Sequence, residues 1–97
     1  MSTRRSADLA AADRAVLWHP FTQQQGWSGE EPLVIERAEG IDLIDADGRR
    51  YIDGVSSLWC NVHGHRHAGI DKAVRDQLDR VAHSTMLGLT HGPAADL

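Results

Sequence analysis

The clearest pattern of apolar and polar positions lies between residues 68 and 83. Its apolar side chains recur at the three- and four-residue spacing of one helical face: Ile70, Ala73, Val74, Leu78, Val81 and Ala82. This spacing predicts an amphipathic helix over 68–83. Two acid–base pairs on it, Asp71–Arg75 and Asp76–Arg80, contribute only about 0.2–0.5 kcal/mol each. We therefore expect burial of the apolar face to hold this helix.

A second, shorter helix is expected near the start of the chain. Residues 6–17 are rich in alanine, with apolar positions near helical spacing. Pro20 ends this helix, because the residue before a proline disfavours helical geometry. We expect 1–5 to be disordered, and we divide the chain into an N-terminal tail with a short helix, 1–17, and a longer segment, 18–97.

The middle of the chain predicts a small antiparallel sheet. Strand-like patterns occur over 33–36, 41–45 and 49–52, and the Asp-Ala-Asp-Gly turn at 45–48 joins the last two as a hairpin. Before the sheet, 24–32 reads as a loop, because two glycines and a proline interrupt it. The fold class is therefore α+β: a short helix, a small hairpin or meander, and an amphipathic helix.

Residues 53–67 have a different character and are expected to be mostly irregular. They contain two serines, a tryptophan, the only cysteine and three alternating histidines. Mixed polar and apolar side chains on an irregular segment are typical of a pocket wall. After the long helix, 86–93 reads as a loop. Pro93 then begins what looks like the first turn of another helix, so we expect a chain cut short.

Composition excludes several classes of function. The chain has 97 residues, room for one domain at most, with 41% hydrophobic and 25% charged residues. A net charge of -4 gives no general attraction to nucleic acid or to an anionic membrane. The single cysteine, Cys60, forms no internal disulfide, and no apolar run reaches the length of about 18 residues that a membrane span needs. We expect a cytoplasmic protein.

Most of the candidate chemistry has a simpler structural interpretation. His63, His65 and His67 alternate, as zinc ligands of a small hydrolase would, but hydrogen bonding to backbone or lining a pocket is favoured. Cys60 reads as a small buried or pocket thiol. Lys72, the only lysine, lies on the polar helix face and has no reason to be activated.

Four segments carry a more specific pattern: Trp-His-Pro-Phe-Thr-Gln at 18–23, Asp-Gly-Val-Ser-Ser-Leu-Trp at 53–59, His-Gly-His at 63–65 and His-Ser-Thr-Met-Leu-Gly-Leu-Thr-His at 83–91. In this order they resemble the N-terminal part of the 8-amino-7-oxononanoate aminotransferases, which are class-III aminotransferases. The resemblance extends from about Leu17 to the end. It implies a segment of a fold-type-I, α/β enzyme that uses pyridoxal 5'-phosphate, works as a homodimer and acts on small molecules.

In that family the cofactor carries an amino group from S-adenosylmethionine or lysine to 8-amino-7-oxononanoate, giving 7,8-diaminononanoate in biotin biosynthesis. The resemblance places the Schiff-base lysine and the cofactor-binding residues later in a longer chain. It therefore implies no catalytic, cofactor-binding or metal residue here, and a fragment that is inactive alone.

The resemblance also implies three substrate-binding residues. Trp59 matches an aromatic that packs around the alkyl chain of the ketone, Phe21 lies near substrate and donor, and Leu58 lies beside them. Leu58 replaces a tryptophan, Phe21 lacks the hydroxyl of a tyrosine, and Ala68 replaces a proline found in many members. The combination of Phe21 and Leu58 looks similar to lysine-using members, but the donor stays open.

Three alternatives remain. One is another class-III aminotransferase with a different keto acceptor. A second is the small metal-binding hydrolase that would use His63, His65 and His67. The third is a non-catalytic binding module.

Overall fold

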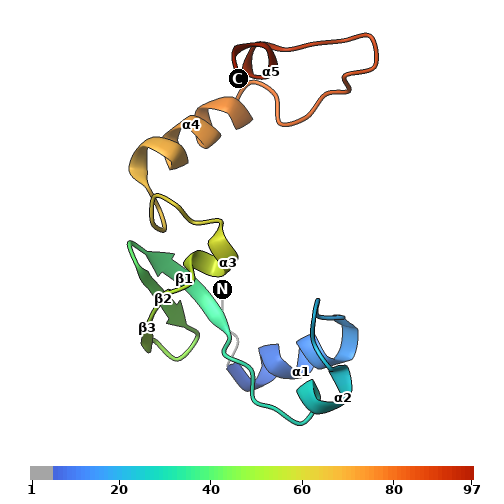
Figure 1. The fold of residues 1–97 in the computed structure, drawn as a ribbon, viewed down its shortest axis with the longest axis vertical. Helices are drawn as coiled ribbons and strands as arrows, with labels where there is room; N and C mark the ends of the chain where they lie inside the picture. Colours follow the sequence, from blue (N-terminus) through green and yellow to red (C-terminus); the bar gives the residue numbers. More distant parts are fainter. Residues whose placement is uncertain (1–5) are drawn as a thin grey trace. The chain divides into compact units, whose positions relative to one another are not determined.

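The computed structural model describes residues 6–97, and Figure 1 draws them as a ribbon. Contacts within the chain divide it into two compact units, Met1–His65 and Arg66–Leu97. The disordered tail expected over 1–5 lies outside the described residues.

The first unit opens with α1 (Ser6–Val16), which confirms the helix expected over 6–17. The backbone N–H of Leu17 still donates to the carbonyl of Asp13 (2.9 Å), so helical hydrogen bonding continues one residue further. Ala10, at the middle of the helix, is buried. The alanine-rich sequence therefore forms a helix with one small side chain turned inward.

A second, one-turn helix, α2 (Gln24–Trp27), corrects the prediction of a loop over 24–32. The side chain of Gln23 accepts a hydrogen bond from the backbone N–H of Gly26 (2.7 Å), and the backbone N–H of Trp27 donates to the Gln23 carbonyl (3.0 Å). A side-chain cap satisfies donors that a helix start leaves open. This cap forms the turn despite the glycine.

Three strands form one antiparallel sheet in the order β1–β2–β3: β1 (Ile35–Glu39), β2 (Asp42–Asp45) and β3 (Arg50–Ile52). The hairpin of the second and third strands is confirmed, with Leu43 opposite Tyr51. The strand predicted over 33–36 is wrong in its bounds. Pairing with β2 sets the extent of β1 and shifts register between Ile35 and Arg37, so apolar content alone misplaces it.

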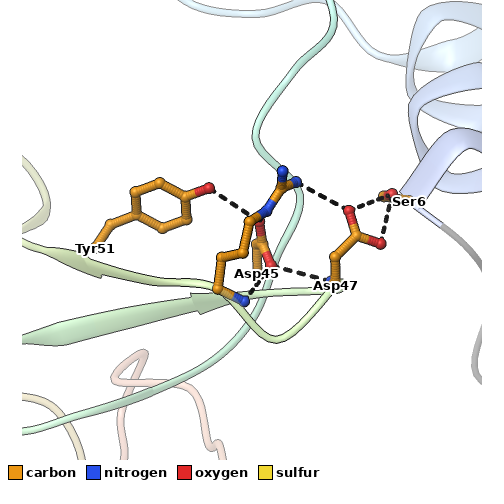
Figure 2. A network of polar contacts seen from close by, with 5 residues as sticks. Ser6, Asp45, Asp47 and Tyr51 are labelled. Carbon is orange, nitrogen blue, oxygen red and sulfur yellow. Dashed lines mark hydrogen bonds and ion pairs between the residues drawn. The ribbon is translucent and has the colours of Figure 1, made fainter.

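Asp45 holds the hairpin turn from inside. Its Oδ1 accepts the backbone N–H groups of Asp47 (3.0 Å) and Arg49 (2.8 Å), and its Oδ2 accepts from the Arg49 guanidinium (2.8 Å) and the Tyr51 hydroxyl (3.1 Å). Figure 2 shows this network, with Tyr51 on one side of Asp45 and Asp47 on the other. With 2% exposure, Asp45 is among the most buried residues described. The turn prediction for 45–48 is confirmed.

Hydrogen bonding keeps the Asp45 carboxyl ionised despite its burial. Burial raises its pKa, but the backbone N–H and guanidinium of Arg49 and the hydroxyl of Tyr51 outweigh burial and leave the pKa below its usual value. An ionised carboxylate is the form that accepts four donors at once.

One further contact ties the start of α1 to the hairpin. The hydroxyl of Ser6 donates to the Asp47 carboxylate, at 3.0 Å from each oxygen, and the Arg49 guanidinium pairs with the same carboxylate at 2.9 Å (Figure 2). The polar network therefore runs from the sheet to the first turn of the helix.

The second unit contains α4 (Ala68–Leu78) and α5 (Gly92–Asp96). Each is preceded by an N-cap histidine whose Nδ1 accepts a backbone N–H: His67 from Ile70 (3.3 Å) and His91 from Ala94 (3.2 Å). The helical turn expected from Pro93 is confirmed by α5.

The prediction that the long helix continues to His83 is wrong, because α4 ends at Leu78. The carbonyl of Gln77 accepts the backbone N–H groups of Asp79, Arg80 and Val81, which lie two, three and four positions later, and this shared acceptor tightens the turn at the helix end. Its expected apolar face is not buried in the described chain: Ile70 is 47% exposed and Val74 53%.

Two conclusions on class follow. The structure combines helices with a small antiparallel sheet, so the predicted α+β organisation is confirmed. Within residues 6–97, no helix has both the length and the apolar character that crossing a bilayer requires.

We expect Asp45→Asn to loosen the hairpin turn. An amide nitrogen would face donors, so backbone hydrogen exchange over 45–50 should accelerate about threefold to tenfold, the effect of losing one ordinary hydrogen bond. Hydrogen-exchange mass spectrometry of the full-length protein measures this. Asp47→Asn is the matched control, because the Asp47 carboxylate accepts from the side chains of Ser6 and Arg49. Equal acceleration in both variants would contradict this account of the turn.

Candidate functional site

Among residues 6–97, the most unusual backbone is that of α3 (Ser56–Trp59), a short element within the segment 53–67 that was expected to be mostly irregular. It is a left-handed turn, with φ of 52°, 48°, 65° and 69° along its residues, none of which is glycine. Residues with a side chain cost about 1–2 kcal/mol each in this conformation. Such strain gathers at ligand sites when the surrounding structure maintains it. The turn is therefore the first candidate for a functional element.

Asp53 maintains the strained turn. Its Oδ1 accepts the backbone N–H of Ser57 (2.9 Å), and its Oδ2 accepts the Ser57 hydroxyl (2.7 Å). The backbone N–H and the hydroxyl of Ser57 lower the pKa of Asp53 against the opposing effect of burial, and His65 adds to the lowering. The carboxylate is thus held ionised where it grips the second residue of the turn.

His65 connects Asp53 to the sheet. Its Nε2 lies 2.7 Å from Oδ2 of Asp53. Its backbone pairs with Gly40: the N–H of His65 donates to Gly40 (2.8 Å), and the N–H of Gly40 donates back (3.0 Å). The side chain of Asp53 is 5% exposed and that of His65 is 16% exposed. Both line a hollow of about 160 Å³, together with Ser56 and Asn61. The turn is therefore anchored through a covered carboxylate–imidazole pair.

The residues expected to bind substrate are open to solvent in the described chain. Leu58 is 62% and Trp59 82% exposed, and both belong to the left-handed turn. Phe21 is also fully exposed and has a positive φ of 50°. The structure thus brings Leu58 and Trp59 together in α3 and places Phe21 in another segment, where 18–23 line a shallow hollow of their own.

A second carboxylate–histidine pair holds the segment that carries Phe21. His19 Nε2 lies 2.8 Å from Oδ2 of Asp13, and the indole N–H of Trp27 donates to the same oxygen (3.2 Å). The rings of His19 and Trp27 lie 4.5 Å apart between centroids. The His19 side chain is the main cause of the lowered pKa of Asp13. This cluster joins α1, the start of 18–23 and α2.

Sequence reasoning missed both organising carboxylates. Asp53 was visible as half of an Asp-Gly turn pair, but its partner His65 lies twelve positions away, beyond any local spacing rule. Asp13 and His19 are six positions apart across a helix end. The available signal was an acid near each histidine-rich motif, which indicates a pair only once the fold is known.

The histidines behave mostly as the simpler interpretation predicts. His65 binds a carboxylate and lines a hollow, while His67 and His91 accept backbone N–H groups. Within residues 6–97, no group of three or more histidine, cysteine, aspartate or glutamate side chains is arranged to hold a metal ion. The structure therefore gives no support to a zinc hydrolase built on His63, His65 and His67.

Lys72 and Cys60 both lie at the surface of the described chain. Lys72 is mostly exposed, and its Nζ pairs with Asp76 at 2.5 Å. The sequence had predicted a pair between Asp76 and Arg80. That prediction is wrong, because Asp76 pairs with Lys72. Cys60 is exposed rather than buried, which corrects one expectation, and its thiol donates to the Leu58 carbonyl (3.3 Å).

Comparison with known proteins places these features in a family. Residues 24–97 match the model of the aminotransferase class-III family. The adenosylmethionine-8-amino-7-oxononanoate aminotransferase of Nitratidesulfovibrio vulgaris is 61% identical over 93 residues, which is 96% of this chain and 17% of that protein. The chain therefore spans less than a fifth of the length of this relative.

Solved structures agree in fold. The adenosylmethionine-8-amino-7-oxononanoate aminotransferase of Methanocaldococcus jannaschii superposes with a TM-score of 0.89 at 41% identity, over 94% of this chain and 21% of that one. The taurine:2-oxoglutarate aminotransferase of Bifidobacterium kashiwanohense, in complex with pyridoxal phosphate and glutamate, gives 0.85 at 25% identity, over 99% and 20%. The local structure thus matches the corresponding fifth of larger enzymes.

We expect Gly64→Ala to weaken the anchor between His65 and Gly40. Gly64 has a φ of 79°, and an added Cβ would lie 3.1 Å from the Gly40 carbonyl oxygen. The left-handed conformation alone should cost about 1–2 kcal/mol. Urea unfolding of the full-length protein measures the loss. Gly54→Ala, where no heavy atom lies within 4 Å of the added Cβ, is the control, and an equal loss in both variants would refute the role of this backbone bridge.

Proposed function

The chain belongs to the class-III aminotransferase family, and from that premise we propose that the protein containing it transfers an amino group to 8-amino-7-oxononanoate. The product is 7,8-diaminononanoate, an intermediate of biotin biosynthesis. The observation that carries this proposal is the 61% identity, across 96% of the chain, to a relative named for this reaction. The motifs at 18–23, 53–59 and 83–91 lie within the shared region and favour the same substrate.

Pyridoxal phosphate is the cofactor of the proposal, but the described residues do not themselves fit it. A Schiff base requires a lysine amine, and the single lysine, Lys72, is ion-paired with Asp76 on an exposed helix surface. We therefore assign cofactor binding and the reactive lysine to parts of the protein outside this chain. The chain alone is then inactive, and the active form is a cytoplasmic homodimer.

The role of this chain in the reaction is to form part of the substrate wall. Leu58 and Trp59 present apolar surface from the left-handed turn that Asp53 holds through Ser57, and Phe21 presents a second aromatic ring. A ketone with a long methylene chain and polar ends requires such apolar walls with few polar groups. In this proposal the division at 17/18 separates the N-terminal tail and helix from the segment that carries all three residues of the wall.

The amino donor is proposed to be S-adenosylmethionine, after the names of the relatives from N. vulgaris and M. jannaschii. Lysine is the second candidate, because Phe21 and Leu58 together look similar to lysine-using members. Another keto acceptor is the second candidate function, since the taurine:2-oxoglutarate aminotransferase shares the local fold.

The full-length protein should form 7,8-diaminononanoate from 8-amino-7-oxononanoate when a donor and pyridoxal phosphate are supplied. Mass spectrometry of the product, with each donor in turn, measures this. Product with S-adenosylmethionine and none with lysine is the expected result. Amino transfer to other ketones with no 7,8-diaminononanoate from either donor would replace the proposed substrate.

Trp59→Ala should raise the KM for 8-amino-7-oxononanoate about tenfold, because the alkyl chain loses the apolar surface of one aromatic ring. Trp59→Phe retains a ring and should stay within about threefold of the parent. Steady-state kinetics at saturating donor separates them. An unchanged KM in Trp59→Ala would remove Trp59 from the substrate wall.

A further inference from the structure

We infer that Asp53 is a positioning residue for the substrate: gripped by His65, its carboxylate fixes the left-handed turn that aims Leu58 and Trp59. This inference rests on the proposed function for its substrate. The geometry that carries it is independent of that function, because it concerns how one side chain sets the backbone direction of two others.

Several hydrogen bonds converge on the side chain of Asp53. Both oxygens of Asp53 are used: Oδ1 by the Ser57 backbone N–H, and Oδ2 by the Ser57 hydroxyl and His65 Nε2. The Asp53 backbone is fixed as well, since its N–H donates to the Ile41 carbonyl (2.8 Å) and its carbonyl accepts from Ser56 (3.3 Å). The carboxylate is therefore a rigid acceptor fixed at the edge of the sheet.

The Asp53 carboxylate binds the residue whose backbone sets the direction of the turn, Ser57. Ser57 has φ 48° and ψ 50°, a conformation that a serine rarely adopts. Asp53 binds both its N–H and its hydroxyl, so the carboxylate selects the orientation of this peptide unit. Leu58 follows directly, with φ 65° and ψ 58°. A right-handed Ser57 would redirect the chain before Leu58 and turn both apolar side chains elsewhere.

Without the Asp53 side chain, the turn would keep only hydrogen bonds that do not fix its handedness. Its remaining backbone bonds are short-range: Trp59 donates to Val55 (2.9 Å), and Cys60 and Asn61 donate to Ser56 (3.0 Å each). Such bonds close a turn of either hand. The bonds from Asp53 come from outside the turn and distinguish one hand from the other. Asp53 does not touch the substrate in this account, so its role is positioning and not chemistry.

The role of His65 follows from its two attachments. Its backbone is paired with Gly40, and its ring reaches Oδ2 of Asp53. It therefore limits rotation of the carboxylate about the Cβ–Cγ bond. The oxygen that His65 holds is the one that receives the Ser57 hydroxyl, so the imidazole sets the plane in which the carboxylate meets the turn.

The experiment removes the carboxylate and then restores the backbone conformation by another route. In the full-length enzyme, Asp53→Ala should raise the KM for 8-amino-7-oxononanoate about tenfold, as misplaced binding groups do, with kcat changed less than about twofold. Adding Ser57→Gly should reverse most of this increase in KM, because glycine adopts a positive φ without support from a side chain. Adding Ser57→Ala instead should leave the KM as high as in Asp53→Ala. Asp47→Asn, a carboxylate outside this network, should leave KM and kcat unchanged.

A merely structural role for Asp53 gives a different pattern. It would lower the thermal midpoint and the active fraction, hence kcat, with KM unchanged, and glycine and alanine at position 57 would act alike. An unchanged KM in Asp53→Ala, or equal effects of glycine and alanine at position 57, overturns the inference. If Asp53→Ala yields no folded enzyme, the single variant Ser57→Ala, which removes one hydrogen bond at an exposed residue, replaces it. A smaller KM increase of about threefold is then expected, and no increase overturns the inference.

A second measurement separates this inference from the proposed function. Fluorine NMR of protein labelled with 5-fluorotryptophan reports the Trp59 environment without any substrate, with Trp59→Phe assigning the signal. The Trp59 resonance should broaden or shift in Asp53→Ala and return in Asp53→Ala/Ser57→Gly. If the parent enzyme fails to use 8-amino-7-oxononanoate while this response is present, the proposed substrate falls and the positioning by Asp53 stands. An unchanged Trp59 signal overturns the positioning role whatever the substrate.

Discussion

Carboxylates that accept several hydrogen bonds at once hold the first unit together. The buried apolar side chains among residues 6–97 are Ala10 and Ile44, so hydrophobic burial supplies little of the local order there. Asp45 fixes the hairpin turn, Asp53 fixes the left-handed turn, and Asp13 joins the two N-terminal helices to the segment between them. Each of the three has a lowered pKa, since bound donors favour the ionised form.

This arrangement explains how a small piece of structure positions apolar side chains that it does not bury. Leu58, Trp59 and Phe21 all have positive φ and all face solvent in the described chain. Leu58 and Trp59 follow Ser57, which the Asp53 carboxylate binds, and Phe21 follows His19, which pairs with Asp13. Strain at ligand-facing residues, held by polar contacts behind them, is a common way to preorganise a binding surface. In an aminotransferase such a surface would be completed by residues from outside this chain.

What the sequence predicted and what it missed follow from the range of the interactions. The helix over 6–17 and the hairpin around the Asp45 turn depend on near neighbours, so spacing and turn residues were enough. The handedness of α3 depends on a carboxylate and on a histidine twelve positions beyond it, so no local pattern reveals it. The end of α4 at Leu78 was missed because no glycine or proline marks it. There, the backbone N–H groups of Arg80 and Val81 share the Gln77 carbonyl as acceptor.

The proposed role of Asp53 is to hold a left-handed turn that presents Trp59 to the proposed keto substrate. A crystal structure of the full-length protein with 8-amino-7-oxononanoate bound tests it most directly. We expect a positive φ at Ser57, hydrogen bonds from Ser57 to both oxygens of Asp53, and van der Waals contact, within about 4 Å, between the Trp59 ring and the methylene chain. A right-handed Ser57, or a Trp59 ring directed away from the ligand, would contradict it.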